Sequence, residues 1–400
     1  MTHEYIIIGG GPTGASAIEG IREHDKEGRI LLLSRENSPP YQRPPLSKDL
    51  WFGKTTLDKL PVHDDAFYRD NHVQLSLRRE VLEIDPDKKQ VWDDNNTMYE
   101  YGKLLIATGG YPRRMNVEGS DHESIRYFRS LEDYQLLRER AERIHHVLVL
   151  GAGFIGMELA AALRHTGLEV TLLYPEQYPL SRVLPRDLGL FVADYYRQHG
   201  IETVSGEKIA RFDAPGEEIV AYTQSGNSVT TQLVIAGIGL EPATDLADAA
   251  GLQVNKGIEV DEMARTSDPN IYAAGDVAEF PCIPLEQRMR MEHWDHALMH
   301  GKAAGANMAG ANQPYTHLPM FFSDLFDLGW EAVGCVESHL DTHAVWKQEH
   351  REGIVYYLWD DVIQGVLLWN TWGAVDWGRE LIAKKQIMTR EEREELKPPA

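Results

Sequence analysis

Two segments of the chain share one pattern: a short apolar run, a glycine-rich turn, a helix-like stretch and a second apolar run. In EYIIIGGGPTGASAIEGI, the pattern predicts a buried strand over Ile6–Ile8 and a helix over Ala15–Ile21, and RILLLSRE supplies the second strand. In HHVLVLGAGFIGMELAAALRHTGLEVTLLYPE, it predicts strands over Val147–Leu150 and Val170–Leu173 with a helix between them. The order strand, turn, helix, strand is typical of a parallel sheet in an α/β protein.

Three glycines give the first turn the spacing G-x-G-x-x-G. Gly9 permits the tight turn, Gly11 lets the backbone approach a pyrophosphate, and Gly14 lets the helix pack on the strand. The N-terminus of the helix adds free N–H groups and the positive end of its dipole, which favour a phosphate. Glu36 lies about 22 residues beyond Gly14, close to where a ribose-binding carboxylate is expected.

The second turn repeats the spacing with Gly151, Gly153 and Gly156. Glu176 follows the second strand of this segment, about 20 residues beyond Gly156. A carboxylate at this place suits the free ribose hydroxyls of NAD and would repel the extra phosphate of NADP. The second segment therefore predicts a site that prefers NAD.

One glycine motif alone is weak evidence, because glycine-rich turns between strand and helix also serve packing. Two complete copies, each with both strands, a helix and an acidic end, predict two dinucleotides, a flavin and a nicotinamide. Further strand-and-glycine segments, Leu104–Arg113 and Leu233–Pro242, agree with this reading. A Gly-Asp pair after a strand is usually only a turn. Here, after the strand Ile271–Ala274, it makes Asp276 a candidate for binding the ribityl chain of FAD.

The stretch YQRPPLSKDLW joins two prolines to two cations. Pro44 and Pro45 fix φ and remove two backbone donors, so we expect a rigid extended turn and not a helix. A surface loop with solvated charges is the alternative. In a chain with two dinucleotide units, we favour a turn that holds Arg43 and Lys48 against a cofactor.

A buried lysine in that turn needs a partner, because an unpaired buried ammonium costs several kcal/mol. The candidate is Glu158, in the first turns of the second predicted helix, between Met157 and Leu159. A glutamate there also favours the helix dipole without any partner. The apolar neighbours indicate a partly buried turn, so we predict a Lys48–Glu158 ion pair.

Composition narrows the class of protein. A formal charge of −22 disfavours nucleic acid and anionic membrane surfaces as partners. No apolar run reaches the ~20 residues of a membrane-spanning helix, and the predicted strand starts almost at the N-terminus, so we expect a cytoplasmic protein. The two cysteines, Cys282 and Cys335, form no CxxC pair and no zinc ligand set.

The chain resembles the FAD-dependent pyridine-nucleotide reductases that lack a redox disulfide: ferredoxin, rubredoxin and putidaredoxin reductases and, most of all, apoptosis-inducing factor. The resemblance covers nearly the whole chain, through PPYQRPPLSKDLWF, IATGGYPR, GAGFIGMELA, AGIGLEP, IYAAGDVAEF, RMEHWDHALMHGKAAGANM and MFFSDLFDLGWEAVG. It implies an FAD domain in two pieces, 1–120 and 241–316, an NAD domain, 121–240, and a C-terminal α+β domain of interface or dimerisation type, 317–400. The expected fold class is α/β with two Rossmann-like domains followed by this α+β domain.

The resemblance assigns roles to several residues. Arg43 would lie along FAD, with Lys48 near the flavin N5. Phe154 would be a gate over the flavin that moves when nicotinamide enters, although it is otherwise read as a core aromatic. We expect Lys48, Glu158 and Phe154 to be catalytic. The candidates for contacting FAD or NAD are Gly9, Gly11, Pro12, Thr13, Gly14, Arg35, Glu36, Arg43, Lys48, Val81, Thr108, Gly109, Arg129, Gly151, Gly153, Phe154, Ile155, Gly156, Glu158, Glu176, Arg182, Gly239, Asp276, Glu292, His293, Trp294, Phe322 and Glu331.

The chain departs from the family's pattern at two positions. Arg35 stands where the family has an acidic residue on the FAD ribose, so Glu36 is the expected substitute. Phe322 stands where relatives have a tryptophan against the flavin. His293, His296 and His300 could also suggest metal ligands, but the two-cofactor reading already accounts for a segment that places His293 and Trp294 near the flavin, and we expect no metal.

The C-terminal part is rich in tryptophan, which predicts a separate aromatic core. GIVYYLWDDVIQGVLLW is expected to form a hairpin with its turn around Asp360 and Asp361. REEREELKPPA is expected to be a frayed polar tail.

The expected function is an NADH-dependent FAD oxidoreductase that passes electrons on without thiols. The acceptor stays open between a small iron–sulfur protein or rubredoxin, and a quinone or oxygen. Such carrier proteins are commonly acidic, and only fragments such as RRMNVEG and EQRMRM offer basic residues to meet one. A slowly turning, NADH-responsive regulator is the alternative of another class, and a homodimer is kept open.

Overall fold

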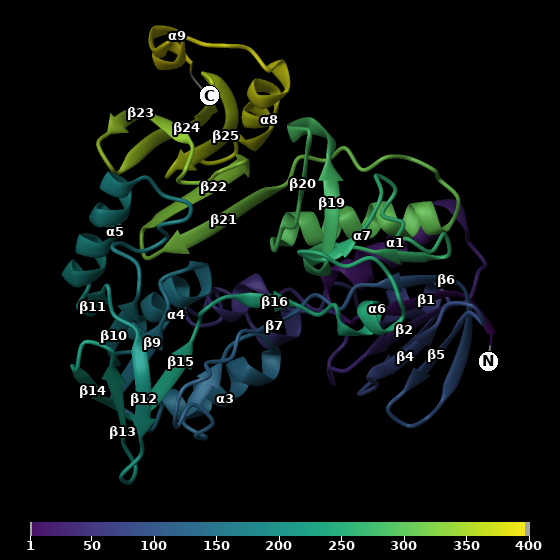
Figure 1. Ribbon diagram of the computed structural model, residues 1–400, viewed down its shortest axis with the longest axis horizontal. Helices are drawn as coiled ribbons and strands as arrows, with labels where there is room; N and C mark the ends of the chain where they lie inside the picture. The colour runs from purple at the N-terminus through teal and green to yellow at the C-terminus, as the bar shows by residue number, and fades with distance from the viewer. Residues whose placement is uncertain (1, 397–400) are drawn as a thin grey trace. The chain divides into compact units, whose positions relative to one another are not determined.

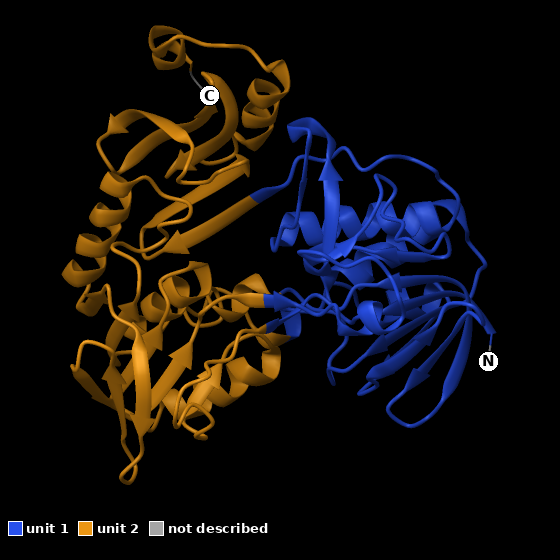
Figure 2. Ribbon diagram, viewed as in Figure 1, with its two compact units in different colours: residues 1–42, 58–111, 241–320 blue, residues 43–57, 112–240, 321–400 orange. Residues whose placement is uncertain are grey.

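The computed structural model describes residues 2–396 and divides them between two compact units. The first unit contains residues 1–42, 58–111 and 241–320, and the second contains residues 43–57, 112–240 and 321–400 (Figure 2). The chain thus passes between the units five times. The three-domain division expected from the sequence stays a prediction, because the second unit combines a central part of the chain with its C-terminal part.

The first unit is built on a Rossmann-like sheet in the order β3-β2-β1-β6-β5-β4, with β18 beside β6. Its elements are β1 (Thr2–Ile8), α1 (Pro12–His24), β2 (Ile30–Ser34), α2 (Asp65–Asp70), β3 (Val73–Leu77), β4 (Val81–Asp85), β5 (Gln90–Asp93), β6 (Met98–Ile106), α6 (Asp245–Ala249), β17 (Ile258–Glu259), β18 (Ile271–Ala273), the 3-10 helix η3 (Gly275–Val277), β19 (Ala278–Cys282), the 3-10 helix η4 (Ile283–Leu285), β20 (Gln287–Met289) and α7 (Trp294–Met308). Strands β3, β2, β1, β6 and β18 run parallel, and β4 and β5 complete an antiparallel meander with β6.

Helix α1 follows β1 directly and packs closely on α7. Small residues make this packing possible, since a Cβ atom on Gly20 would clash with the backbone of Lys302, and one on Gly305 would clash with the backbone of Ala17. Because α7 comes from a distant part of the sequence, the contact joins the pieces of the first unit.

The second unit begins with a short segment and a second parallel sheet, in the order β11-β10-β9-β15-β8. Its elements up to this sheet's end are the 3-10 helix η1 (Pro44–Leu46), β8 (Ile125–Tyr127), α3 (Leu131–Ala141), β9 (His146–Leu150), α4 (Phe154–His165), β10 (Glu169–Tyr174), α5 (Arg186–Gln198), β11 (Ile201–Ser205), β12 (Ile209–Asp213), β13 (Ile219–Thr223), β14 (Ser228–Thr231) and β15 (Leu233–Ala236). The 3-10 helix η2 (Leu57–Lys59) and strands β7 (Gly110–Pro112) and β16 (Leu240–Pro242) each contain a boundary between the units. The parallel α/β units predicted from the two apolar patterns are therefore both present.

The C-terminal part of the second unit is a sheet in the order β21-β22-β25-β24-β23, with helix α8 packed on β22 and β25 (Figure 1). Its elements are β21 (Met320–Leu325), β22 (Leu328–Gly334), β23 (Asp341–Gln348), β24 (Glu352–Trp359), β25 (Val362–Trp369), α8 (Val375–Lys384) and α9 (Arg390–Glu395). The predicted hairpin is confirmed, because β24 and β25 pair antiparallel around a turn in which Asp360 and Asp361 have φ of 49° and 59°. The predicted aromatic core is present too: Trp330 and Trp369 are fully buried and stack with ring centroids 4.9 Å apart.

The tail differs from its prediction. Residues 390–395 form helix α9, which starts with a capping box between Thr389 and Glu392, and Arg393 is buried and donates to the Asp361 carboxylate at 3.3 Å. The polar composition concealed this helix because its stability comes from the cap and from one arginine, not from an apolar face. The last four residues of the predicted tail, 397–400, lie outside the described residues. Among residues 2–396, none of the helices has the length and apolar character needed to cross a membrane.

Candidate functional site

The two glycine-rich loops have matching backbones. The first glycine of each loop, Gly9 or Gly151, has a positive φ, of 130° and 97°. A Cβ atom on Gly9 would lie closer than 3.0 Å to the Ala107 carbonyl, and one on Gly151 equally close to the Gly237 carbonyl. Each turn is therefore pressed against the strand end next to it in the sheet, at a distance that only glycine allows.

The other glycines of each loop also take matching roles. A Cβ atom on Gly14 would clash with the carbonyl of Gly9, and one on Gly156 with that of Gly151, so both close the helix onto its own turn. Gly11 and Gly153 cap α1 and α4 with φ of −92° and −81° and with no capping hydrogen bond from a side chain.

The space beside the capping glycines fits a pyrophosphate. Within their own units, no described atom lies within 4 Å of the position of a Cβ atom on Gly11 or Gly153. The first-turn N–H groups of α1 and α4 therefore border open backbone, which is the arrangement that binds a dinucleotide phosphate. The residues present fit FAD at one loop and NAD(H) at the other.

A carboxylate follows the second strand of each parallel unit. Glu36 comes after β2, is half-buried, and accepts a hydrogen bond from the Tyr41 hydroxyl at 2.6 Å. Glu176 comes after β10 and is exposed. Arg35 pairs with Glu80 at 3.4 Å, and its guanidinium lies over the ring of Tyr111. Glu36 thus lies near the end of β2, where the sequence predicts a ribose-binding carboxylate.

Other predicted FAD residues lie at the strand ends of the first unit. Thr108 donates to the Ala243 carbonyl at 2.9 Å, and Gly109 accepts from the Ala243 N–H at 3.0 Å, just beyond β6. Asp276 lies in η3, beyond β18, and its carbonyl accepts from Arg290 at 3.0 Å. Pro12 and Thr13 are buried in the first turn of α1, and Val81 is the buried first residue of β4.

The predicted histidine segment forms the start of α7 in the first unit. His293 caps this helix, Trp294 is its first residue, and Glu292 pairs with Arg290 at 2.6 Å. Burial lowers the pKa of His293 to about 4, although the charges of Asp276 and Asp295 act in the opposite direction. The imidazole is therefore neutral at ordinary pH.

His296 and His300 are fully buried in an aromatic cluster with Phe280 and Tyr315. His300 accepts from the Gly275 N–H at 3.3 Å, and His296 lies 3.1 Å from the Tyr315 hydroxyl. Burial lowers the pKa of His300 to about 3 and that of His296 well below its usual value. In the described part of the chain, no group of three or more histidine, cysteine or acidic side chains has the geometry to hold a metal ion.

The proline segment corrects one expectation. Pro44–Leu46 is a 3-10 helix, where we expected an extended turn without helix. Prolines at the first two positions of a helical turn lose no hydrogen bond, because the first N–H groups of a helix have no partner in it anyway, and the φ of proline suits the turn. Arg43, which precedes it, donates to the Arg129 carbonyl at 2.9 Å.

The predicted ion pair is present within the second unit. Lys48 Nζ lies 3.0 Å from Glu158 Oε1, and the two side chains are 9% and 5% exposed. Glu158 is in the second turn of α4, five positions beyond the capping glycine Gly153. A cation from the proline segment and a carboxylate from the helix of the second glycine loop therefore meet in one buried cluster.

Three further groups complete this cluster, and none of them was predicted to be part of it. Ser47 and Ser323 each donate to a Glu158 carboxylate oxygen at 2.6 Å. Asp324 Oδ2 lies 3.5 Å from Lys48 Nζ. The only signal in the sequence was adjacency: Ser47 precedes Lys48, and Ser323 and Asp324 follow the predicted Phe322. The ring of Phe322 lies under Lys48 Nζ, 4.3 Å from its centroid.

Phe154, the predicted gate, is half-buried at the start of α4. Its ring contacts Phe321 edge-on at 5.5 Å and lies 6.4 Å from Trp330, between centroids. The next residue, Ile155, is 41% exposed. The aromatic core of the C-terminal sheet thus supports one side of Phe154.

The remaining candidates of the second unit are spread around this region. Gly239 has a φ of 104° just after β15. Arg182 is exposed, and its carbonyl accepts from the Ser338 N–H at 2.8 Å. Glu331 is in β22 and accepts from the Gly373 N–H at 2.8 Å.

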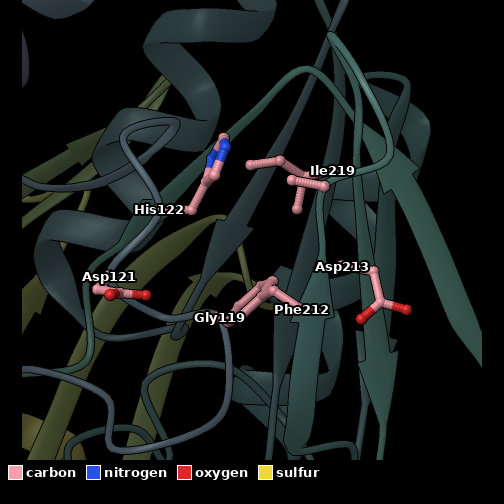
Figure 3. Close-up of a pocket in the computed structure, with 7 residues that line it drawn as sticks. Gly119, Asp121, His122, Phe212, Asp213 and Ile219 are labelled. Atoms are coloured by element: carbon pink, nitrogen blue, oxygen red, sulfur yellow. The ribbon is translucent and has the colours of Figure 1, made fainter.

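A pocket elsewhere in the second unit has a volume of about 250 Å³ (Figure 3). It is lined by Gly119, Asp121, His122, Phe212, Asp213, Ala214 and Ile219. None of these residues belongs to the candidate site, and the lining has neither a glycine-rich turn nor a helix N-terminus.

Comparison with known proteins agrees with this geometry. Residues 3–301 match the family model of pyridine nucleotide-disulphide oxidoreductases, and residues 304–352 match that of the apoptosis-inducing factor, mitochondrion-associated, C-term. Apoptosis-inducing factor 1, mitochondrial, of Dictyostelium discoideum is 33% identical over 96% of this chain and 79% of its own length. Rubredoxin-NAD(+) reductase of Pseudomonas putida is 32% identical over 84% of this chain and 87% of its own length.

Solved structures give the same answer for the fold. A ferredoxin reductase from Rhodopseudomonas palustris, 29% identical, matches 97% of this chain and 96% of its own with a TM-score of 0.91. The reductase in a covalent putidaredoxin reductase–putidaredoxin complex, 30% identical, matches 96% of this chain and 94% of its own with a TM-score of 0.90. The chain therefore belongs to the pyridine nucleotide-disulphide oxidoreductase family, and it is an NAD(H)-dependent flavoprotein oxidoreductase that uses FAD.

Proposed function

We propose that this protein takes electrons from NADH through FAD and passes them to a small iron–sulfur or rubredoxin-type carrier protein. The observation that carries the proposal is the buried Lys48–Glu158 pair, which joins a fixed cation to the helix of the NAD(H) loop. FAD, when bound, would supply the hydride-transfer and electron-transfer chemistry. The protein's own contribution is to bind, orient and tune charge.

Each predicted residue has a specific task in this proposal. The glycine loops at α1 and α4 bind the two pyrophosphates, and Glu176 binds the ribose hydroxyls of NAD. Lys48 places a positive charge where negative charge develops on the flavin, and Glu158 compensates the ammonium when no such charge is present. Phe154 covers the place that the nicotinamide takes.

We favour direct transfer of electrons from the flavin to a protein carrier over transfer through a pair of thiols. The chain has two cysteines, Cys282 and Cys335, which belong to different units, and no neighbouring pair. Relatives named for rubredoxin, rhodocoxin and putidaredoxin reduction support a carrier of this kind.

One of the two basic fragments seen in the sequence, EQRMRM, is a poor docking site for such a carrier. Arg288 donates to the carbonyls of Val260 and Glu279, and Arg290 pairs with Glu292. These guanidinium groups are therefore engaged within the first unit, so the carrier is expected to tolerate an acidic reductase.

An anaerobic titration tests the proposal. NADH should bleach the yellow protein with one equivalent per flavin, and subsequent mixing with ferredoxin or rubredoxin should reoxidise it faster than quinone or oxygen does. A colourless protein that takes up no added FAD would contradict the cofactor assignment. Faster reoxidation by quinone or oxygen than by either carrier would contradict the acceptor.

A second function is supported by the match of residues 304–352 to the apoptosis-inducing factor C-terminal model and by the 33% identity to such a factor. In this case the protein is an NADH-responsive regulator that reoxidises slowly with every acceptor. Sedimentation with and without NADH separates the two functions, because only the regulator should change its oligomeric state with reduction. This is also the test of the homodimer that we kept open.

A further inference from the structure

Both oxygens of the Glu158 carboxylate accept a short hydrogen bond from a buried serine. Ser47 Oγ lies 2.6 Å from Oε2, and Ser323 Oγ lies 2.6 Å from Oε1. Ser47 belongs to the proline segment and Ser323 to strand β21, so the two donors come from opposite ends of the sequence. Ser323 is fully buried and Ser47 almost so.

Strand β21 surrounds the ion pair with three consecutive side chains. The Phe322 ring lies under the Lys48 ammonium, Ser323 donates to Glu158, and Asp324 lies 3.5 Å from Lys48 Nζ. Asp324 is 47% exposed, in contrast to the buried Glu158. Lys48 therefore has one fixed carboxylate inside the protein and one solvated carboxylate at its edge.

The donors set the state of the carboxylate. A carboxylate with two hydroxyl donors and an ammonium is satisfied only as an acceptor, which is its ionised form. Burial and the charge of Glu158 together raise the pKa of Tyr196 well above its usual value. Tyr196 itself donates its hydroxyl proton to the Met157 carbonyl at 3.0 Å, so this proton does not replace a serine on Glu158.

We propose that Ser47 and Ser323 are positioning residues for the flavin reaction, which hold Glu158 ionised and fixed so that Lys48 stays in place. The inference rests on the proposed function, because it assumes that Lys48 acts on bound flavin. It assigns to the C-terminal sheet a direct part in setting the charge at the site, through one hydroxyl. Among the described residues, Lys48 pairs with Glu158 and the charge of Glu158 acts on Tyr196, while Asp324 faces Lys48.

The test compares Ser47→Ala, Ser323→Ala and the double variant with the unaltered protein, all loaded with FAD. Stopped-flow mixing with NADH under anaerobic conditions gives the rate of flavin reduction across pH. The loss of one hydrogen bond to a charged group is worth about a tenfold change, so each substitution should move the acidic limb of the rate profile upward by about one pH unit. The double variant should move it by about two, with the NADH concentration at half-maximal rate changed less than about threefold.

A second measurement needs no turnover. Removing the donors should lower the urea midpoint, because each hydroxyl stabilises the buried carboxylate through a hydrogen bond. Ser225→Ala is the matched control, because Ser225 also donates to a glutamate, Glu207, in the same unit but at the surface. It should leave the rate profile unchanged and lower the midpoint by less, because its hydrogen bond is exposed.

The possible outcomes separate the two proposals. If NADH does not reduce the unaltered protein, the proposed function fails. If it does, and the double variant keeps the unaltered rate profile and midpoint, the positioning role of the serines is wrong. Should Ser323→Ala not fold, Ser323→Cys keeps the size of the side chain with a weaker donor and must show the same upward movement of the acidic limb, or the role is wrong.

Discussion

The two glycine-rich loops differ mainly in the residues that come after the shared glycines. In α1, the first two helical residues are Pro12 and Thr13, and both are buried. In α4, the corresponding residues are Phe154, which is half-buried, and Ile155, which is 41% exposed. The first two helical residues are therefore buried in the first unit and more accessible in the second.

A second difference lies one turn further along each helix. Five positions beyond the capping glycine, α1 has Ser16 and α4 has Glu158, and both side chains are buried. At this position the second helix thus has a buried carboxylate with Lys48 as its partner, where the first has a neutral serine. The two loops share a backbone and differ in the charge at this position.

The largest effect is expected where the two loops are identical. Gly14→Ala and Gly156→Ala each place a Cβ atom against a carbonyl of the preceding turn, which cannot move without opening the loop. Each substitution should lower the free energy of unfolding by about 3 kcal/mol or more, or prevent folding. Urea unfolding measures this, with Gly216→Ala, at a site free of neighbours within its own unit, as the control. Equal stability of Gly156→Ala and Gly216→Ala would refute the close approach.

The next effect should appear only in the second unit. Lys48→Ala leaves Glu158 buried without its cation, at a cost of about 3–5 kcal/mol in the free energy of unfolding. Flavin reduction by NADH should slow by about 100-fold while FAD stays bound, since a charge-stabilising group of this kind is worth about that much. Stopped-flow absorbance and flavin content measure both. Ser16→Ala, at the matching position of α1, should change the rate of reduction by less than about twofold.

A normal rate of flavin reduction in Lys48→Ala would remove the role of the ion pair. The double variant Lys48→Met/Glu158→Leu sharpens the result, because it removes both charges together. It should recover most of the lost stability and none of the lost rate.

Substitutions of the two capping glycines should show which loop binds which cofactor. A Cβ atom on Gly153 meets no described atom of its own unit, so Gly153→Ala should fold normally and weaken NADH binding by about tenfold with FAD content unchanged. Gly11→Ala should instead lose FAD. Flavin absorbance per protein and the NADH dependence of flavin reduction test the two assignments. Loss of FAD in Gly153→Ala would reverse them.

The sequence was sufficient for the parts that depend on local pattern. Both glycine loops, the hairpin at Asp360 and Asp361 and the Lys48–Glu158 pair could be inferred from spacing, turn chemistry, resemblance and the cost of a lone buried charge. The loops and the hairpin each involve one segment, so local pattern was enough to predict them. The Lys48–Glu158 pair joins two distant segments, but a buried lysine needs a carboxylate, and the apolar neighbours of Glu158 made it the candidate.

The remaining features depend on contacts between distant segments. Ser323 reaches Glu158 across more than a hundred positions of sequence, and no pattern in a single chain marks a serine as a donor. The 3-10 turn at Pro44–Leu46 was missed because two prolines are compatible with both an extended and a 3-10 backbone. The burial of His296 and His300 likewise depends on Phe280 and Tyr315, which pack around them.

The smallest expected effect is on the pH dependence of stability and concerns the histidines of α7. These side chains are buried in the neutral form, unlike the buried ion pair of the second unit. The second unit buries Lys48 and Glu158 as charges, whereas the first buries His300 neutral, with its pKa lowered by burial to about 3. An unfolded histidine has a pKa of about 6.5, so between these values the unfolded chain binds a proton that the folded protein does not. The free energy of unfolding should therefore decrease as the pH is lowered through this range, by roughly 1.4 kcal/mol per pH unit for each such histidine.

His300→Phe tests whether His300 is buried in its neutral form, because it keeps an aromatic ring against Tyr315 and removes the titrating group. In urea unfolding between about pH 6.5 and pH 4, the free energy of unfolding should change less steeply with pH than in the unaltered protein. The difference in slope should correspond to about one proton. His339→Gln, at an exposed position of the second unit, should leave the slope unchanged. An unchanged slope in His300→Phe would mean that this histidine already carries its proton in the folded protein. The contrast between a charged cluster in one unit and a neutral cluster in the other would then be lost.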